Sequence, residues 1–151
     1  MHTAPPLLIE SLRSGSIASL ALMPLGLAFR ALELRIGHYG PKFAALYVDD
    51  PQPALLFVQH LVIGWVSALP LLWLLARGIG STAPVLAGAA YGTAYYVLIN
   101  ALALPRFFGD PLPWQLGAST VLPSLIAHMA FGALISFAAR GFLARNRAAH
   151  V

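Results

Sequence analysis

The chain has 151 residues, of which 59% are hydrophobic and only 9% are charged, and its mean hydropathy is +0.77. Soluble domains carry roughly 25% charged residues, so the composition excludes a soluble globular protein and indicates a single-domain integral membrane protein. The net charge of +4 comes from nine basic residues scattered between apolar segments. Such a distribution is typical of residues that set membrane topology, and it does not form the basic patch of a nucleic-acid-binding surface. The lack of Cys excludes a disulfide framework, a thiol nucleophile and Cys-ligated metals.

Four apolar segments predict transmembrane helices. We expect the spans at 14–30, 53–76, 82–104 and 117–139, with an arginine at or just beyond the end of three of them (Arg30, Arg77 and Arg140). The link at 78–81 is so short that the second and third spans should be antiparallel neighbours. The whole chain, 1–151, is therefore expected to be an all-α integral membrane four-helix bundle.

An even number of spans places both termini on one side of the membrane. That side would hold five basic residues, which are Arg13, Arg77, Arg140, Arg145 and Arg147. The opposite side would hold four, which are Arg30, Arg35, Lys42 and Arg106. The positive-inside rule then favours cytoplasmic termini.

A His-x-x-x-Gly pattern occurs twice inside uncharged segments, as His60 with Gly64 and as His128 with Gly132. The spacing puts each His and Gly on one helix face. An ionisable residue at membrane depth is a functional-site hypothesis. The recurrence indicates either two tandem helical hairpins of the same orientation or a chance repeat in an Ala/Gly-rich chain.

Two further helix faces carry polar or small residues at intervals of four. They are Gly92, Tyr96 and Asn100 on one helix, and Ser124, His128, Gly132 and Ser136 on another. At about 1.5 Å per residue, Tyr96, Asn100 and both histidines lie within roughly 16 Å of the membrane surface away from the termini. If these faces meet, they form a buried polar cluster. Gly88 and Gly92 also give the small-xxx-small spacing of close helix packing.

Three interpretations of this cluster remain open. Interhelical hydrogen bonds from His, Asn, Tyr and Ser commonly hold transmembrane helices together. Alternatively, the histidines respond to protons near neutral pH, or His60 and His128 hold haem b as axial ligands. A metal site is disfavoured, because no carboxylate or thiol lies at that depth to complete a ligand set.

No catalytic residue is assigned. The chain contains no nucleophile elbow, P-loop, dinucleotide-binding fingerprint or zincin motif. The paired carboxylates Asp49 and Asp50 precede Pro51, which is typical of a turn or a helix cap.

The chain resembles the YagU-type family of small bacterial inner-membrane proteins. The resemblance rests on Gly15 and Met23 in the first helix, His60, Tyr91-Gly92, Leu104-Pro105, and His128 with Gly132. It implies a bacterial multi-pass protein of the inner (plasma) membrane, and it implies no particular chemistry.

The function expected from the sequence is that of a non-enzymatic structural or accessory subunit. Four short helices enclose little by themselves, so the partners would be the lipid bilayer and either further copies of the chain or a larger membrane complex, with no nucleic acid. The alternative is a haem- or proton-handling redox or transport protein that uses the His60/His128 pair. An enzyme is the third choice.

Overall fold

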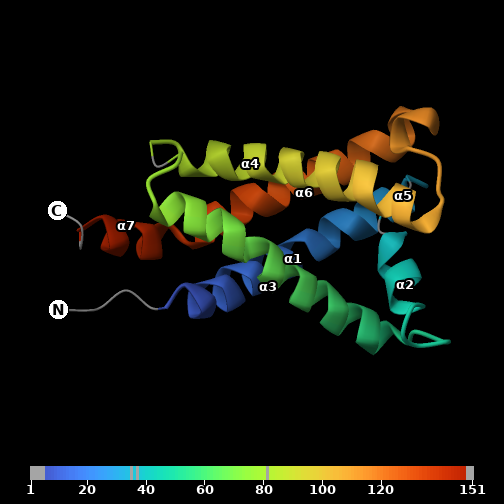
Figure 1. Ribbon diagram of the computed structural model, residues 1–151, viewed down its shortest axis with the longest axis horizontal. Helices are drawn as coiled ribbons and strands as arrows, with labels where there is room; N and C mark the ends of the chain where they lie inside the picture. The colour runs from blue at the N-terminus through green and yellow to red at the C-terminus, as the bar shows by residue number, and fades with distance from the viewer. Residues whose placement is uncertain (1–5, 35, 37, 81, 149–151) are drawn as a thin grey trace.

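The computed structural model describes residues 6–34, 36, 38–80 and 82–148. This part of the chain consists of helices and turns, with no strand. In order, the elements are α1 (Leu7–Ala31), α2 (Tyr39–Ala44), α3 (Pro53–Ala76), α4 (Pro84–Tyr95), the π-helical segment η1 (Tyr96–Ala103), α5 (Leu104–Phe108), the 3₁₀ turn η2 (Pro113–Gln115), α6 (Ala118–Ala138) and α7 (Arg140–Ala148) (Figure 1).

Four helices in the described residues are long and apolar enough to cross a membrane. They are α1, α3, α6 and the continuous rod of α4, η1 and α5 from Pro84 to Phe108. This confirms the expected all-α four-helix membrane bundle. The start of α1 and the end of α7 lie at the same end of the bundle (Figure 1).

The span boundaries differ from the sequence expectation in two places. The first helix begins at Leu7 and not at 14, because Glu10 and Arg13 pair with each other inside its first turns. The third continues to Phe108, past the expected end at 104, and it runs through Pro105 directly after the π-helical segment η1. Arg35 and Ser81, which the sequence places in the connections, lie outside the described residues.

The bundle consists of two antiparallel helix pairs. α1 packs along α3, α4 packs along α6, and α1 also contacts α6. The short link does make α3 and α4 consecutive antiparallel helices (Figure 1). They nevertheless pack on each other far less than each packs on its own partner. The two pairs therefore follow one another along the chain as tandem hairpins.

The hydrophobic core lies toward the end that carries the termini. Its buried members are Ala18, Ala68, Leu71, Leu72, Leu75, Ile135, Ala139, Phe142 and Leu143. The last two come from α7, whose remaining side chains include Arg145 and Arg147. α7 is thus a short amphipathic helix that closes this end of the bundle.

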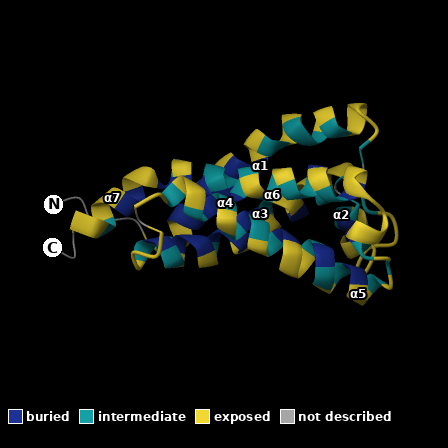
Figure 2. Cartoon of the chain, turned by 90° about the horizontal axis from the view of Figure 1, so that it is seen from above, coloured by how far each residue is buried: buried dark blue, intermediate teal, exposed yellow. Residues whose placement is uncertain are grey.

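The second half of α1 leaves the bundle. Residues up to Ser19 include six that are buried, whereas no residue of α1 after Ser19 is buried. Figure 2 shows this part of the helix standing apart from the others, coloured along its length as exposed or intermediate. Pro24 lies in this stretch.

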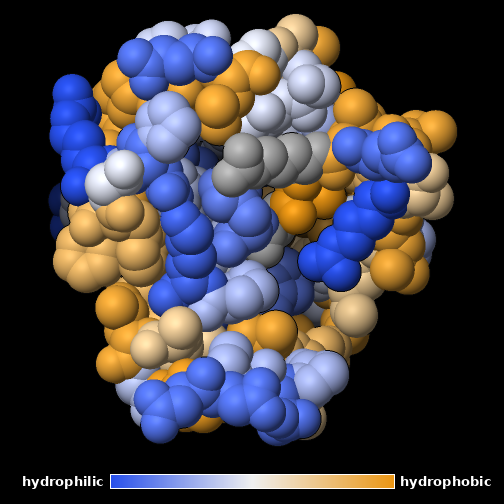
Figure 3. Space-filling model, turned by 90° about the vertical axis from the view of Figure 1, so that its right-hand side faces the viewer, coloured by the Kyte–Doolittle hydropathy of each residue, from blue (hydrophilic) through white to orange (hydrophobic). Residues whose placement is uncertain are grey.

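The opposite end of the bundle is held by polar contacts around α2. Lys42 Nζ lies 2.6 Å from both carboxylate oxygens of Asp110. Gln59 on α3 is buried, donates to the carbonyl of Gly40 (2.9 Å) and accepts from the Tyr47 hydroxyl. Figure 3 shows this end, where hydrophilic side chains lie among apolar ones.

Candidate functional site

The contact between α4 and α6 is made through three buried glycines. A Cβ built on Gly88 would overlap the carbonyl of Gly132, and one on Gly132 would overlap the carbonyl of Gly88. A Cβ on Gly92 would overlap the carbonyl of His128. The two backbones are therefore in direct contact, as small-xxx-small packing requires, and this contact sets the position of His128.

His128 uses both of its ring nitrogens inside the bundle. Nδ1 lies 2.6 Å from the carbonyl oxygen of Ser124, and Nε2 lies 2.7 Å from the amide nitrogen of Asn100. A carbonyl only accepts and an amide nitrogen only donates, so Nδ1 carries the hydrogen and Nε2 accepts. The ring is held as a neutral imidazole with no free nitrogen.

Two tyrosines flank the imidazole of His128. The Tyr95 ring is stacked on it at 5.8 Å with an interplanar angle of 21°, and the Tyr96 ring lies at 5.7 Å and 53°. We call His128, Asn100, Tyr95 and Tyr96 the His128 cluster. Its rings are packed against each other, so the histidine is enclosed on its faces as well as bonded at both nitrogens.

The cluster also reaches α3 through Ser67. The Ser67 hydroxyl donates to the Tyr95 hydroxyl at 3.1 Å. The neighbouring Tyr91 hydroxyl donates to the Ser67 carbonyl at 2.7 Å. These bonds join α3 to α4, two helices that otherwise pack little on each other.

The π-helical segment η1 places Asn100 and Tyr96 in the cluster. A π turn is wider than an α turn, and such turns recur at functional sites. Asn100 lies inside this segment and reaches His128 across the helix pair. Tyr96 opens the segment, and its buried hydroxyl has no hydrogen-bond partner in the described part of the chain.

His60 lies in the other helix pair. Its Nε2 is 3.3 Å from the carbonyl oxygen of Ser19 on α1, and its side chain is exposed. Gly64, one turn further along α3, is buried against Gly15 and Ser19. The contacts of His60 thus run to α1, whereas those of His128 run to η1 and to its own helix.

The two histidines that were predicted to act as a pair are accordingly divided between different contacts. Asn100, Tyr96 and His128 lie together. Ser124 belongs with them through its backbone carbonyl, whereas the prediction invoked its side chain. His60 takes part in a separate contact with α1, because the close pairing of α4 with α6 keeps His128 between those two helices.

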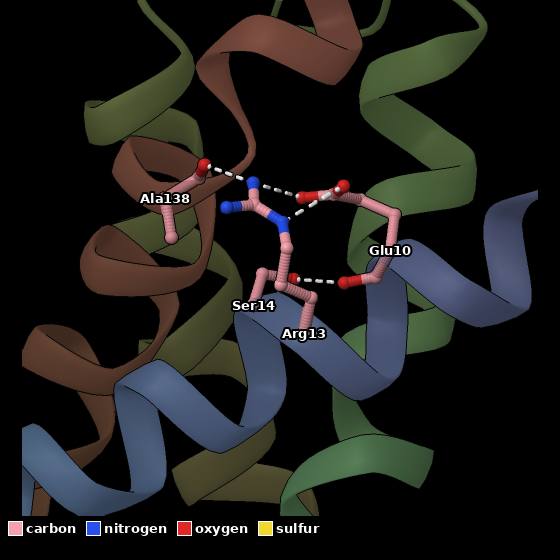
Figure 4. Close-up of polar contacts among 4 residues, drawn as sticks. All are labelled: Glu10, Arg13, Ser14 and Ala138. Atoms are coloured by element: carbon pink, nitrogen blue, oxygen red, sulfur yellow. Dashed lines mark hydrogen bonds and ion pairs between the residues drawn. The ribbon is translucent and has the colours of Figure 1, made fainter. Parts of the chain in front are cut away.

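An ion pair with a buried carboxylate was missed by the sequence reasoning, which began the first span at Ser14. Glu10 has 2% of its surface exposed, and its carboxylate accepts from Arg13 Nη2 at 2.7 Å and from Nε at 3.2 Å. Arg13 Nη2 also donates to the carbonyl of Ala138, in the last turn of α6 (2.7 Å, Figure 4). The pair therefore ties α1 to α6, and the Glu-x-x-Arg spacing was the signal that could have revealed it.

Serines along α1 form the polar contacts of the α1/α3 pair and were also missed. The Ser11 hydroxyl donates to the carbonyl of Trp65 at 2.6 Å, and the Trp65 indole donates to the Ser16 hydroxyl at 2.8 Å. The buried Ser19 hydroxyl has no partner in the described residues. The recurrence of Ser and Gly near one face of the first span was the available signal, since small polar residues mark helix contacts in membranes.

Within the described residues no group of three His, Asp or Glu side chains is placed to hold one metal ion. Comparison of the chain with family models, with curated protein sequences and with solved structures finds no match. The fold and the site define a class: a small multi-pass four-helix membrane protein with polar contacts between its helices.

Proposed function

We propose that this chain is a non-enzymatic protein of the bacterial inner membrane, of the YagU type, that acts as a structural or accessory subunit. The observation that carries the proposal is the bonding of His128. An axial haem ligand needs a free ring nitrogen, and a proton-relay histidine needs one that exchanges with water. Both nitrogens of His128 are engaged by Ser124 and Asn100, which favours helix-to-helix adhesion.

A surface for a partner helix is offered by the second half of α1. Leu20, Met23 and Leu27 are 48%, 43% and 64% exposed and follow each other along one face at spacings of three and four. This face points away from the bundle, since Leu22 and Leu25 on the other side of the helix approach α6. A helix that leaves its own bundle in this way is suited to pack on another transmembrane helix, from a second copy or from a larger complex.

The test is the mass of the detergent-solubilised protein together with a matched pair of variants. The triple variant Leu20→Ala, Met23→Ala and Leu27→Ala should return an assembled wild-type species to the mass of one 16.1 kDa chain. The control carries Val58→Ala, Val62→Ala and Val66→Ala, an exposed stripe at spacings of four on α3, and should stay assembled. A monomeric wild type, or equal loss in both variants, contradicts the proposal. So does a Soret band that His128→Leu abolishes.

The orientation belongs to the same proposal. The end with the termini carries five basic residues and one acidic residue, Glu10, which is paired with Arg13. Among the described residues, the other end carries three basic and four acidic residues. A reporter that fluoresces only in the cytoplasm should be bright after Val151 and dark within the loop at 110–114. The reverse pattern contradicts cytoplasmic termini, and equal signals contradict the four spans.

A further inference from the structure

The departure of α1 from the bundle leaves an apolar groove between α1 and α6. It has a volume of about 450 Å³ and is open to the side. α1 contributes Ala21, Leu22 and Leu25, α6 contributes a wall that includes Phe137, and α4 adds Val85. From Ala130 to Phe137 the α6 wall extends over eight residues, and the seven rises between them at about 1.5 Å each give a length of about 10 Å.

A cation stands at the end of this groove nearest the chain termini. The guanidinium of Arg140 lies over the ring of Phe137, 4.5 Å from its centroid, and Phe137 is one of the lining residues. Arg140 is exposed, and its charge is not neutralised by a carboxylate in the described part of the chain. Arg13, at the same end, has Glu10 as its partner.

We propose that the groove binds one acyl chain of an anionic phospholipid whose phosphate contacts Arg140. An apolar slot running along the helices with a cation at its membrane-surface end matches the two parts of such a lipid. The occupant is a lipid and not a helix for reasons of charge. The guanidinium of Arg140 at the end of the groove complements a phosphate, and the apolar face of a transmembrane helix offers it no anion.

The charge part of the proposal is tested by a matched pair of arginines. Arg77 lies over the Trp73 ring at 4.1 Å, near the same end of the bundle, and neither residue lines the groove. The purified protein is offered equal amounts of phosphatidylglycerol and phosphatidylcholine, and retained lipid is counted by native mass spectrometry. Wild type and Arg77→Gln should retain one phosphatidylglycerol in preference. Arg140→Gln should lower that preference by about tenfold, the effect of one charge-assisted contact.

The groove part is tested by filling it. Ala21→Phe places a ring in the groove from an exposed position of α1, and Ala28→Phe places one on the same helix at an exposed position outside the groove. Ala21→Phe should abolish retention of the lipid, and Ala28→Phe should leave it unchanged. Circular dichroism and thermal unfolding confirm that each variant is folded.

Four outcomes overturn the proposal. They are equal retention of the two lipids by wild type, an equal loss in Arg77→Gln and Arg140→Gln, unchanged retention in Ala21→Phe, and a chain dimer that Ala21→Phe dissociates. The last outcome would assign the groove to a second copy of the chain.

Discussion

The α1/α3 pair and the α4/α6 pair can be compared residue by residue, because each sets a His-x-x-x-Gly helix against two small residues four positions apart. The corresponding residues are Gly15 and Gly88, Ser19 and Gly92, His60 and His128, and Gly64 and Gly132. The pairs differ at one of these positions, where Ser19 has a side chain and Gly92 has none. That side chain lies over Gly64.

The difference in side-chain size accompanies a difference in the surroundings and hydrogen bonds of the histidine. In α4/α6 the backbones touch, and His128 is enclosed by two tyrosine rings and bonded at both nitrogens. In α1/α3, His60 is exposed and makes one longer bond to the Ser19 carbonyl. The same sequence pattern thus produces an enclosed polar cluster only where the helices approach most closely and a π turn presents Asn100.

The largest effect should come from adding one methyl group to the α4/α6 contact. Gly92→Ala places its Cβ on the backbone carbonyl of His128, which cannot turn aside, and overpacking of this kind costs about 1–3 kcal/mol. Gly64→Ala meets the Ser19 side chain, which can rotate, so it should cost less. Thermal unfolding in detergent measures both.

Gly26→Ala is the control for the glycine series, because nothing lies within 4 Å of a Cβ at that position. It should leave the melting temperature unchanged or raise it slightly, since Ala favours helix more than Gly does. If Gly92→Ala and Gly26→Ala behave alike, α4 and α6 are not in backbone contact.

A smaller loss is expected where the two pairs are tied together at the terminal end. Arg13→Gln removes the cation from the buried carboxylate of Glu10 and the bond to the Ala138 carbonyl. Arg13 is itself half exposed, so we expect a loss of about 1 kcal/mol, as for a hydrogen bond to a charged group discounted for solvent. Arg30→Gln, an exposed arginine at the other end of α1, should unfold like wild type. Equal melting temperatures for the Arg13 and Arg30 variants would contradict a tie between α1 and α6.

Substitutions of the two histidines should then differ in how much they lower the stability of the protein. His128→Leu leaves Asn100 without its acceptor and should cost up to about 1.7 kcal/mol, the upper range for such bonds in membranes. His60→Leu, at an exposed position, should lower stability by only a few tenths of the loss in His128→Leu. His128→Gln should recover part of the loss, because its side chain still accepts a hydrogen bond. Equal melting temperatures for the two leucine variants would mean that His128 is not bonded as described.

Much of the architecture followed from the sequence, and the site followed only in part. Helix length and hydropathy are local properties, so α3 and α6 fall within one residue of their predicted spans. The pairing of the helices, in contrast, is not a local property of the sequence. The link at 78–81 makes α3 and α4 consecutive, but the glycines of α4 pack on α6. A repeat in the sequence also does not show that its two histidines contact different helices.

The sequence also did not predict the register of the π-helical segment η1. Asn100 was placed on the face of Gly92 and Tyr96 by counting α-helical turns, and it does reach His128, but through a wider turn whose first buried residue is Tyr96. Glu10 and Arg13 were missed because charged residues next to an apolar segment are usually taken to mark the end of the span. Only the pairing of these two side chains with each other lets the helix continue through them.

The polar link between the two pairs at Ser67 should contribute less to stability than the contacts of Arg13 and His128. Tyr95→Phe removes the hydroxyl that accepts from Ser67, and Tyr91→Phe removes the donor to the Ser67 carbonyl. Interhelical hydrogen bonds in membranes average about 0.6 kcal/mol, so each variant should lower stability by about that much. Ser67→Ala keeps the backbone carbonyl. It should therefore be non-additive with Tyr95→Phe, which loses the same bond, and additive with Tyr91→Phe, which loses another. Additivity in both double variants would show that the Ser67 hydroxyl does not bond Tyr95.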